Sequence, residues 1–184
     1  MREDFVEGIS DINVLAVTND RDVMFELAST NLTPIVVSSE QLRKICNDGD
    51  PLCYFILYDS KVICGSLPSV QFKKSDSTCK KLLDYSRAQL RISAEGYMRG
   101  DEVSALNYLF RSVRSFIRAK CCLAGSIPVS NQQVMECCKE RVQNEVCDIF
   151  STTVSLRKDK SPVNLTLINN FKKILDNSFD LSSN

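Results

Sequence analysis

The sequence predicts a mixed fold, in which a small α/β portion is followed by a four-helix up-down bundle. Three observations support it. Apolar runs rich in β-branched residues alternate with short helical patterns early in the 184-residue chain, a stretch of Gly, Pro, Ser and charge follows, and apolar residues then recur at helical spacing. We expect an α/β portion over 1–65, a linker over 66–78 and a helical domain over 79–184.

The α/β portion is predicted to alternate strands with helices. Apolar β-branched runs predict the strands, and apolar stripes that begin at polar capping residues predict the helices. The predicted elements are a strand over 12–18, a helix over 20–30, a strand over 32–38, a helix over 39–47 and a short last strand over 61–65. Pro34 places the second strand at a sheet edge or at its own start, because proline has no N–H to donate to a neighbour.

The helical domain is predicted from apolar residues at positions i, i+3, i+4 and i+7. The clearest stripe lies in 101–124 and includes Leu106, Phe110 and Val113. The predicted helices extend over 79–98, 101–124, 131–156 and 163–176. Short connections between four helices favour antiparallel packing, with Phe150 in the core.

Composition excludes several classes of function. Histidine is absent, so no Ser-His-Asp triad, Cys-His pair or histidine-ligated metal can form. Basic and acidic residues number 23 each, whereas non-specific binders of nucleic acid or anionic membranes usually carry a basic excess. No apolar stretch reaches the roughly 20 residues that span a bilayer, and Met-Arg-Glu-Asp is a poor start for a signal peptide. The sequence therefore predicts a cytoplasmic protein without a membrane partner, and it disfavours nucleic acid as a partner.

The nine cysteines are interpreted as small apolar core residues rather than as a disulfide framework. Their count is odd, and a cytoplasmic chain is expected to stay reduced. Two adjacent pairs, Cys121-Cys122 and Cys137-Cys138, lie in predicted helices. Neighbours in a helix point about 100° apart, which makes a shared metal awkward. A thiolate metal site or redox site is the alternative that this interpretation leaves open.

The start of the first predicted strand, Ser-Asp-Ile-Asn-Val-Leu-Ala-Val at 10–17, carries a resemblance. It resembles the Ser-Asp-Ile-Asp-hydrophobic strand of minimal nucleotidyltransferases, in the DNA polymerase β superfamily. In that family two carboxylates one residue apart point the same way off the strand and hold Mg²⁺ on a nucleoside triphosphate. The resemblance implies Asp11 and Asn13 as catalytic and metal-binding residues, and it implies that Ser10 and Arg2 contact the nucleotide.

Three departures from the family pattern predict a degenerate site. The family's phosphate-binding Gly-Ser turn would fall just before Met1. Asn13 replaces the second carboxylate, and no acid in 32–38 supplies the third, for which Glu40 is the nearest candidate. We therefore expect binding of a nucleotide or a protein partner with little or no transfer.

Two alternative functions remain. One is an active Mg²⁺-dependent transferase that moves an NMP from an NTP to a protein or small-molecule acceptor. The other is a non-enzymatic dimeric interaction module. From the residues alone, Asp11 also fits a strand cap and Asn13 a local hydrogen bond at the start of the strand.

The helical part has a resemblance of its own. Residues 83–124 with the Gly-x-x-Pro turn at 125–128 resemble the first helix pair of HEPN domains, which often accompany minimal nucleotidyltransferases. The segment around Arg157 is similar to the start of that family's Arg-to-His ribonuclease motif, but Pro162 stands near the histidine position. Since the chain has no histidine, that ribonuclease chemistry is excluded. We expect a homodimer through the helical bundle.

Basic residues outside these motifs are interpreted more simply. Arg111, Arg114 and Arg118 recur at helical spacing and would line a nucleotide cleft or a dimer interface, or form a plain polar face. Arg157 is interpreted as a solvated or interface charge. The lysine pairs at 73–74 and 80–81 are interpreted as solvated residues beside the linker, with phosphate contact as the alternative.

Overall fold

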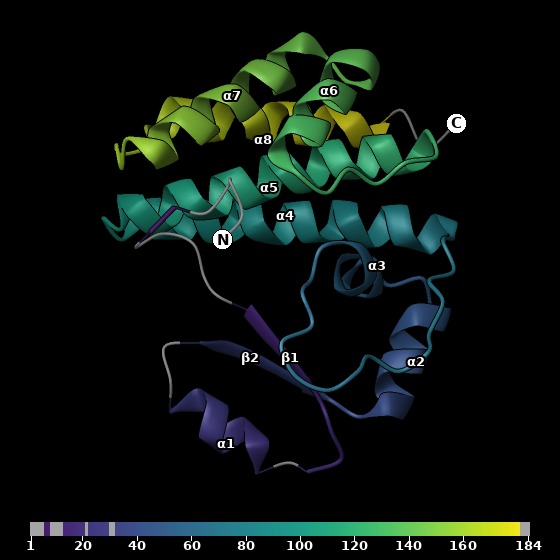
Figure 1. Ribbon diagram of the computed structural model, residues 1–184. Helices are drawn as coiled ribbons and strands as arrows, with labels where there is room; N and C mark the ends of the chain where they lie inside the picture. Colours follow the sequence, from purple (N-terminus) through teal and green to yellow (C-terminus); the bar gives the residue numbers. More distant parts are fainter. Residues whose placement is uncertain (1–5, 8–12, 21, 30–31, 181–184) are drawn as a thin grey trace. The chain divides into compact units, whose positions relative to one another are not determined.

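The computed structural model describes residues 6–7, 13–20, 22–29 and 32–180. The chain divides into two compact units. One is Ser10–Thr78, which contains strands and helices, and the other contains Cys79–Asn184 and is helical in the residues described (Figure 1). A mixed α/β portion followed by helices, as the sequence predicts, is confirmed.

The α/β unit is built on two parallel strands. β1 (Asn13–Val17) and β2 (Thr33–Val37) pair residue for residue, and together they form the sheet of the described residues. α1 (Val23–Ala28) provides the crossover connection that parallel strands need. Both strands lie within one residue of their predicted bounds. Pro34 is the second residue of β2, in a sheet where each described strand has an open edge.

Two capped helices follow the strands. α2 (Ser39–Asn47) starts at a capping box, in which the Ser38 hydroxyl accepts a hydrogen bond from the Gln41 N–H and the Gln41 side chain accepts one from the Ser38 N–H. Its bounds match the prediction. α3 (Pro51–Tyr58) has proline at its first position, where no N–H is required, and Asp50 caps it.

The core of the α/β unit is small. Its buried members come from α2 and α3, namely Leu42, Cys46, Cys53 and Ile56. The partly buried side chains around them include Leu15, Val17, Val37, Leu67, Val70 and Phe72. Three of these belong to the segment that was expected to be a linker, so 66–78 packs against this unit. The strand predicted over 61–65 is wrong, because these residues are exposed and pair with neither of the two described strands.

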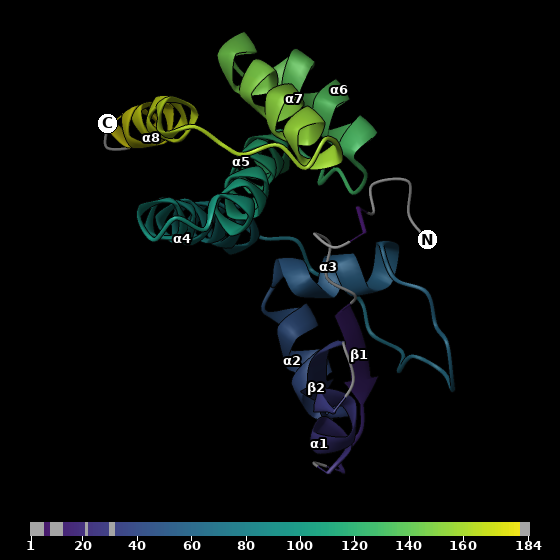
Figure 2. The ribbon, with the colours of Figure 1, turned by 90° about the vertical axis from the view of Figure 1, so that its left-hand side faces the viewer.

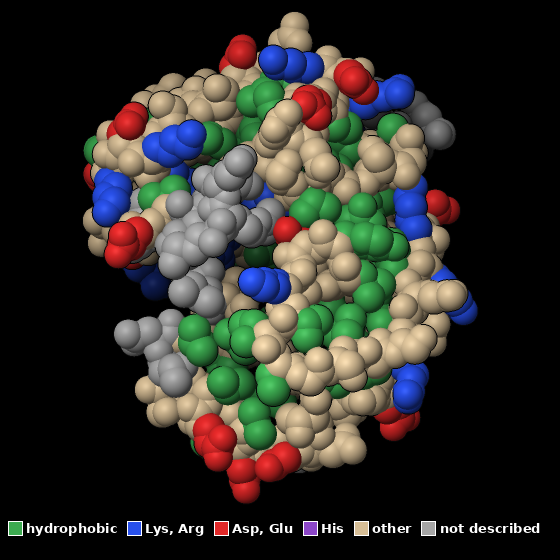
Figure 3. Space-filling model, in the orientation of Figure 1, with side chains coloured by type: hydrophobic (Ala, Val, Ile, Leu, Met, Phe, Trp, Pro, Cys, Tyr) green, Lys and Arg blue, Asp and Glu red, His purple; other side chains and the backbone are tan. Residues whose placement is uncertain are grey.

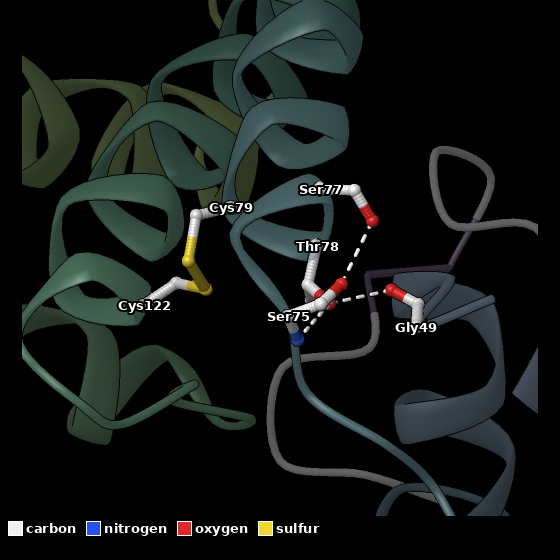
Figure 4. Close-up of a disulfide and its surroundings, with 6 residues drawn as sticks. All are labelled: Gly49, Ser75, Ser77, Thr78, Cys79 and Cys122. Carbon is white, nitrogen blue, oxygen red and sulfur yellow. Dashed lines mark hydrogen bonds between the residues drawn. A yellow bond between two sulfur atoms is a disulfide. The ribbon is translucent and has the colours of Figure 1, made fainter. Parts of the chain in front are cut away.

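The turn after α2 contacts the start of α4 (Asp76–Met98) through a short polar network (Figure 4). The buried Thr78 hydroxyl donates a hydrogen bond of 2.6 Å to the Gly49 carbonyl and accepts one of 3.1 Å from the Ser75 N–H. Gly49 has φ +63°, and a Cβ there would lie 2.7 Å from the Lys73 carbonyl oxygen. Only glycine fits both the backbone conformation and the space.

In the helical unit, α4 and α5 (Glu102–Leu123) lie side by side as an antiparallel hairpin (Figures 1 and 2). Small polar residues line their contact. Ser86 and Ser112 each donate a side-chain hydrogen bond to the other's carbonyl, at 2.8 and 2.6 Å, and Ser93 donates one of 2.7 Å to the Ala105 carbonyl. The three serines are fully buried. Because each hydroxyl donates a hydrogen bond, the contact between the two helices leaves none of these three buried hydroxyls unsatisfied.

The helix predicted over 131–156 is two helices. α6 (Asn131–Arg141) ends at Val142, whose backbone is extended, and α7 (Asn144–Lys158) follows. The break contains neither Gly nor Pro, so no turn signal marks it in the sequence. With α8 (Leu165–Asp180), the helices from α4 onward number five in the described residues, whereas the prediction was four.

Aromatic side chains from three helices form the centre of the helical core. Phe116 in α5 meets Phe171 in α8 edge to face, with ring centroids 5.7 Å apart. Phe110 in α5 stacks on Phe150 in α7 at 5.8 Å. All four are buried, which confirms Phe150 as a core residue. α5 is therefore the helix around which the others pack.

Eight of the nine cysteines form disulfides, which corrects their interpretation as reduced core residues. The bonds are Cys46–Cys53, Cys79–Cys122, Cys121–Cys137 and Cys138–Cys147. Their Cα–Cα distances run from 5.0 to 6.3 Å, within the usual range. Cys64 is free and exposed. Residue spacing does not reveal these partners, because helix packing brings them together.

Candidate functional site

The polar start of β1 is the site that the sequence predicts. Asn13 is the first residue of β1 and is exposed. Ser10, Asp11 and Arg2 lie outside the described residues. The geometry of the site is therefore that of Asn13 and of the residues paired with it.

Strand pairing places Asn13 beside Thr33. Paired residues of parallel strands face the same side, and side chains alternate along each strand. Asn13 and Thr33 therefore share the face of Leu15, Val17 and Val37, which packs against α2 and α3. Both are exposed, whereas the residues that follow them in each strand are partly buried. An amide and a hydroxyl thus lie together at the open end of an apolar sheet face.

Glu40 lies at the opposite end of the sheet from Asn13. It belongs to the first turn of α2, directly after the end of β2, and is exposed. Because the strands are parallel, Asn13 lies at the start of the sheet and Glu40 follows its far end. The two ends are about 13 Å apart, which is the length of one strand. Glu40 therefore completes no cluster with Asn13. Among the described residues, the strand position next to Asn13 on this face holds Thr33 rather than a carboxylate.

The acidic residues after β1 close a turn. The Thr18 hydroxyl accepts a hydrogen bond of 3.0 Å from the Asp20 N–H, and the Asp20 carboxylate accepts one of 2.9 Å from the Asp22 N–H. These bonds lead the chain into α1. Among the described residues, no group of three or more Cys, Asp or Glu side chains is placed to hold a metal ion.

Two arginines of α5 hold the turn that follows this helix. Arg118 is 8% exposed, and it donates hydrogen bonds of 2.9 Å from Nε to the Pro128 carbonyl and 2.6 Å from Nη2 to the Val129 carbonyl. Arg114 donates a further bond of 2.6 Å to the Val129 carbonyl. These contacts correct the interpretation as a plain polar face, because both guanidinium groups fix the path from α5 to α6.

Arg157 is buried, which corrects its interpretation as a solvated charge. It is 5% exposed, and its Cζ lies 4.0 Å from the centroid of the Phe110 ring. The Arg114 Cζ lies 5.7 Å from the same centroid, so this ring contacts two cations. Arg157 follows Phe150 by seven residues, on the same face of α7. That spacing is the sequence signal by which its burial could have been found.

Comparison of the chain with models of protein families, with curated proteins and with solved structures found no match. In the part of the chain that the structure describes, no helix combines the length and the apolar character needed to cross a membrane.

Proposed function

We propose that this chain is a nucleotidyltransferase-like protein that binds a nucleotide without transferring its NMP group. The observation that carries the proposal is the pairing of Asn13 with Thr33, two neutral side chains at the start of the sheet. The Ser-Asp-Ile-Asn strand start and the β1–α1–β2 order support the nucleotidyltransferase likeness.

Transfer of a nucleotidyl group requires negative charge that the described residues do not supply. Carboxylates hold Mg²⁺, which neutralises the triphosphate and orients the attack on the α-phosphorus. The possible metal ligands at the described start of β1 are the amide oxygen of Asn13 and the hydroxyl of Thr33. Neither described strand contains an acidic residue. These residues do not fit a magnesium centre. The amide N–H groups of Asn13 and the hydroxyl of Thr33 can donate hydrogen bonds to a nucleotide but leave its charge uncompensated, so we expect weak binding and no turnover.

Calorimetric titration of the full chain with ATP and UTP, with and without Mg²⁺, tests nucleotide binding. We expect saturable binding in the millimolar range. Asn13→Asp adds a carboxylate on the face shared with Thr33 and should tighten Mg²⁺-dependent binding about tenfold, the effect of one charge-assisted contact. Pro34→Asp is the matched control, because it adds the same charge at the same end of the sheet on the opposite face. An absence of heat at millimolar nucleotide would contradict the proposal.

A transfer assay separates binding from catalysis. The full chain is incubated with labelled ATP or UTP, Mg²⁺ and candidate protein acceptors, and we expect no labelled product. Transfer that disappears in the Asp11→Ala variant would establish an active enzyme and overturn the proposal. Transfer that persists in Asp11→Ala would place the active site elsewhere in the chain.

Exposed apolar side chains favour a second function, that of a dimeric interaction module. Tyr85 and Ile92 lie seven residues apart on α4, two turns along one face, and are 47% and 38% exposed. In the α/β unit, α1 exposes Met24 and Phe25, and Figure 3 shows hydrophobic side chains at the surface of this unit. We infer a homodimer through α4. Sedimentation equilibrium should give a dimer for the natural chain and a monomer for Ile92→Glu, and a monomeric natural chain would contradict it.

A further inference from the structure

The disulfides of the helical unit form one continuous covalent chain across four helices. The bonds are Cys79–Cys122 between α4 and α5 (Figure 4), Cys121–Cys137 between α5 and α6, and Cys138–Cys147 between α6 and α7. α5 and α6 each carry two of the bonded cysteines, at adjacent positions. Each of these helices is therefore tied both to the helix before it and to the helix after it.

The adjacency of the cysteines explains how one helix serves two neighbours. Side chains one residue apart on a helix point about 100° away from each other. In α5, Cys122 therefore reaches the start of α4 while Cys121 reaches α6. The same angle that disfavours a shared metal at a Cys-Cys pair favours two disulfides in different directions.

Five of the six bonded cysteines are buried, and Cys137 is partly buried against the core. Cys121, Cys122 and Cys138 are fully buried, and Cys79 and Cys147 are only 4% and 6% exposed. Cys121, Cys138 and Cys147 also belong to the main hydrophobic cluster of this unit. Each of the three bonds thus has a fully buried cysteine on at least one side. Buried sulfurs are poorly accessible to thiol reductants, so these bonds have the character of structural rather than exchangeable disulfides.

We propose that the helical unit is a redox-dependent fold, whose native form contains all three disulfides and whose ordered packing is lost when they are reduced. The protein then functions in surroundings where structural disulfides persist, instead of the reducing cytoplasm that the sequence predicts. This inference is independent of nucleotide binding.

Each disulfide forms by thiol–disulfide exchange with a small-molecule or protein disulfide as the oxidant. One cysteine thiolate attacks the oxidant and releases a thiol, and the second cysteine then displaces the other oxidant thiol as the S–S bond closes. Two cysteine thiols and one oxidant disulfide thus give one protein disulfide and two oxidant thiols. Six cysteines of the helical unit consume three oxidant disulfides.

Thiol labelling of the full chain tests the oxidised state. The protein is equilibrated with reduced and oxidised glutathione, denatured with N-ethylmaleimide present, and analysed by peptide mass spectrometry with electron-transfer fragmentation, which separates the adjacent cysteines. We expect no label on the six helical cysteines and full label on Cys64. Label on any of the six helical cysteines would overturn the proposal.

Hydrogen exchange and thermal unfolding test the dependence of the fold on these bonds. Reduction in denaturant followed by refolding under a phosphine should remove amide protection from α4–α7 and lower Tm by at least about 20 °C. Combined Cys121→Ala and Cys137→Ala substitution removes the middle bond alone and should lower Tm by roughly 10 °C. Unchanged protection and Tm after reduction would overturn the proposal.

Two controls keep the result specific to the helical unit. Cys64→Ser removes the free thiol and should leave Tm and exchange unchanged. Combined Cys46→Ala and Cys53→Ala substitution removes the disulfide of the α/β unit and should leave exchange in α4–α7 unchanged. If the reduced chain does not refold at all, the fold again depends on the bonds, and the labelling experiment decides whether the six cysteines are oxidised in the native chain.

Discussion

The two units of this chain differ in the depth of their cores. The helical unit buries aromatic and aliphatic side chains from five helices and carries three disulfides. Among its described residues, the α/β unit has a core of four buried residues, and neither described strand contains a buried residue. The candidate site lies in the α/β unit, which has the smaller core. Regions with few buried contacts have a low free energy of local opening, which suits a binding site. Most of the stability of the chain is then expected to come from the helical unit.

The packing of the sheet explains why the core of the α/β unit is small. Parallel strands are usually covered on both faces. Here α2 and α3 cover the face that holds Leu15 and Val17, whereas α1 on the connection between the strands has no buried residue. The stability of this unit therefore depends on a few contacts at its α2–α3 side, and single substitutions in the two units should differ in their effects.

The largest contrast is expected for core truncation. Phe116→Ala removes a fully buried ring that packs against Phe171, so it should lower the free energy of unfolding by about 3–5 kcal/mol. Ile35→Ala in the partly buried β2 should cost less than about 2 kcal/mol. Denaturant unfolding followed by hydrogen exchange in each unit measures both. Equal losses would contradict the difference in core depth.

A smaller effect is expected at the α5–α6 turn. Arg118→Met keeps the apolar stem but removes two hydrogen bonds to the Pro128 and Val129 carbonyls, so it should cost about 3 kcal/mol. Arg91→Met is the matched control, because its ion pair with Glu95 is exposed and should contribute no more than about 0.5 kcal/mol. The denaturant concentration at the unfolding midpoint, measured for both variants, gives the two losses of stability. The interpretation of Arg118 as a structural residue fails if the two variants are equally stable.

In the α/β unit, Gly49→Ala separates crowding from backbone strain. A Cβ at Gly49 meets the Lys73 carbonyl and the backbone has positive φ, so we expect a loss of about 2 kcal/mol. Gly65 has φ +70° with no atom within 4 Å of an added Cβ, so Gly65→Ala reports the strain alone, at about 1 kcal/mol. Hydrogen exchange in α2 and α3 measures the difference. Equal effects would show that the contact with 73–78 is loose.

The smallest effect concerns the acid range in the helical unit. Asp101 caps α5, and hydrogen bonding to Ser104 lowers the pKa of its carboxyl below the ordinary value. Because the folded pKa is the lower one, the stabilisation is present above the unfolded pKa and is lost as pH falls through the folded pKa. Asp101→Asn removes the charge, so it should lower the stability of α5 slightly near neutrality and change little once the pH is below the folded pKa, which flattens the acid profile. An unchanged acid profile would mean that the cap contributes nothing through its charge.

Local signals predicted the elements that depend on local residues. The two strands and the α2 bounds follow from β-branched runs and capping residues that lie within each segment. The site was predictable only as far as Asn13 itself. Its neighbour Thr33 follows from the register of a parallel pair, which no local signal specifies.

What the sequence did not reveal depends on contacts between distant residues. The disulfide partners are up to 43 residues apart and meet only after α4–α7 pack. Arg157 is buried because α7 places it over the Phe110 ring of α5. The break at Val142 carries no turn residue, and 66–78 looks polar although Leu67 and Phe72 pack against the α/β core. In each case packing decides between conformations that the local sequence allows.

The covalent chain through the helices also defines a path for mechanical load. From Cys79 to Cys147 the shortest bonded route runs through three disulfides and the two peptide bonds within the adjacent pairs. Tension along this route bypasses the backbone segments 80–120, 123–136 and 139–146. In the oxidised protein these segments add no contour length under force, and a single proteolytic cut inside one of them releases no fragment. α8 lies beyond the last bond, so it is the helix that pulling would detach first.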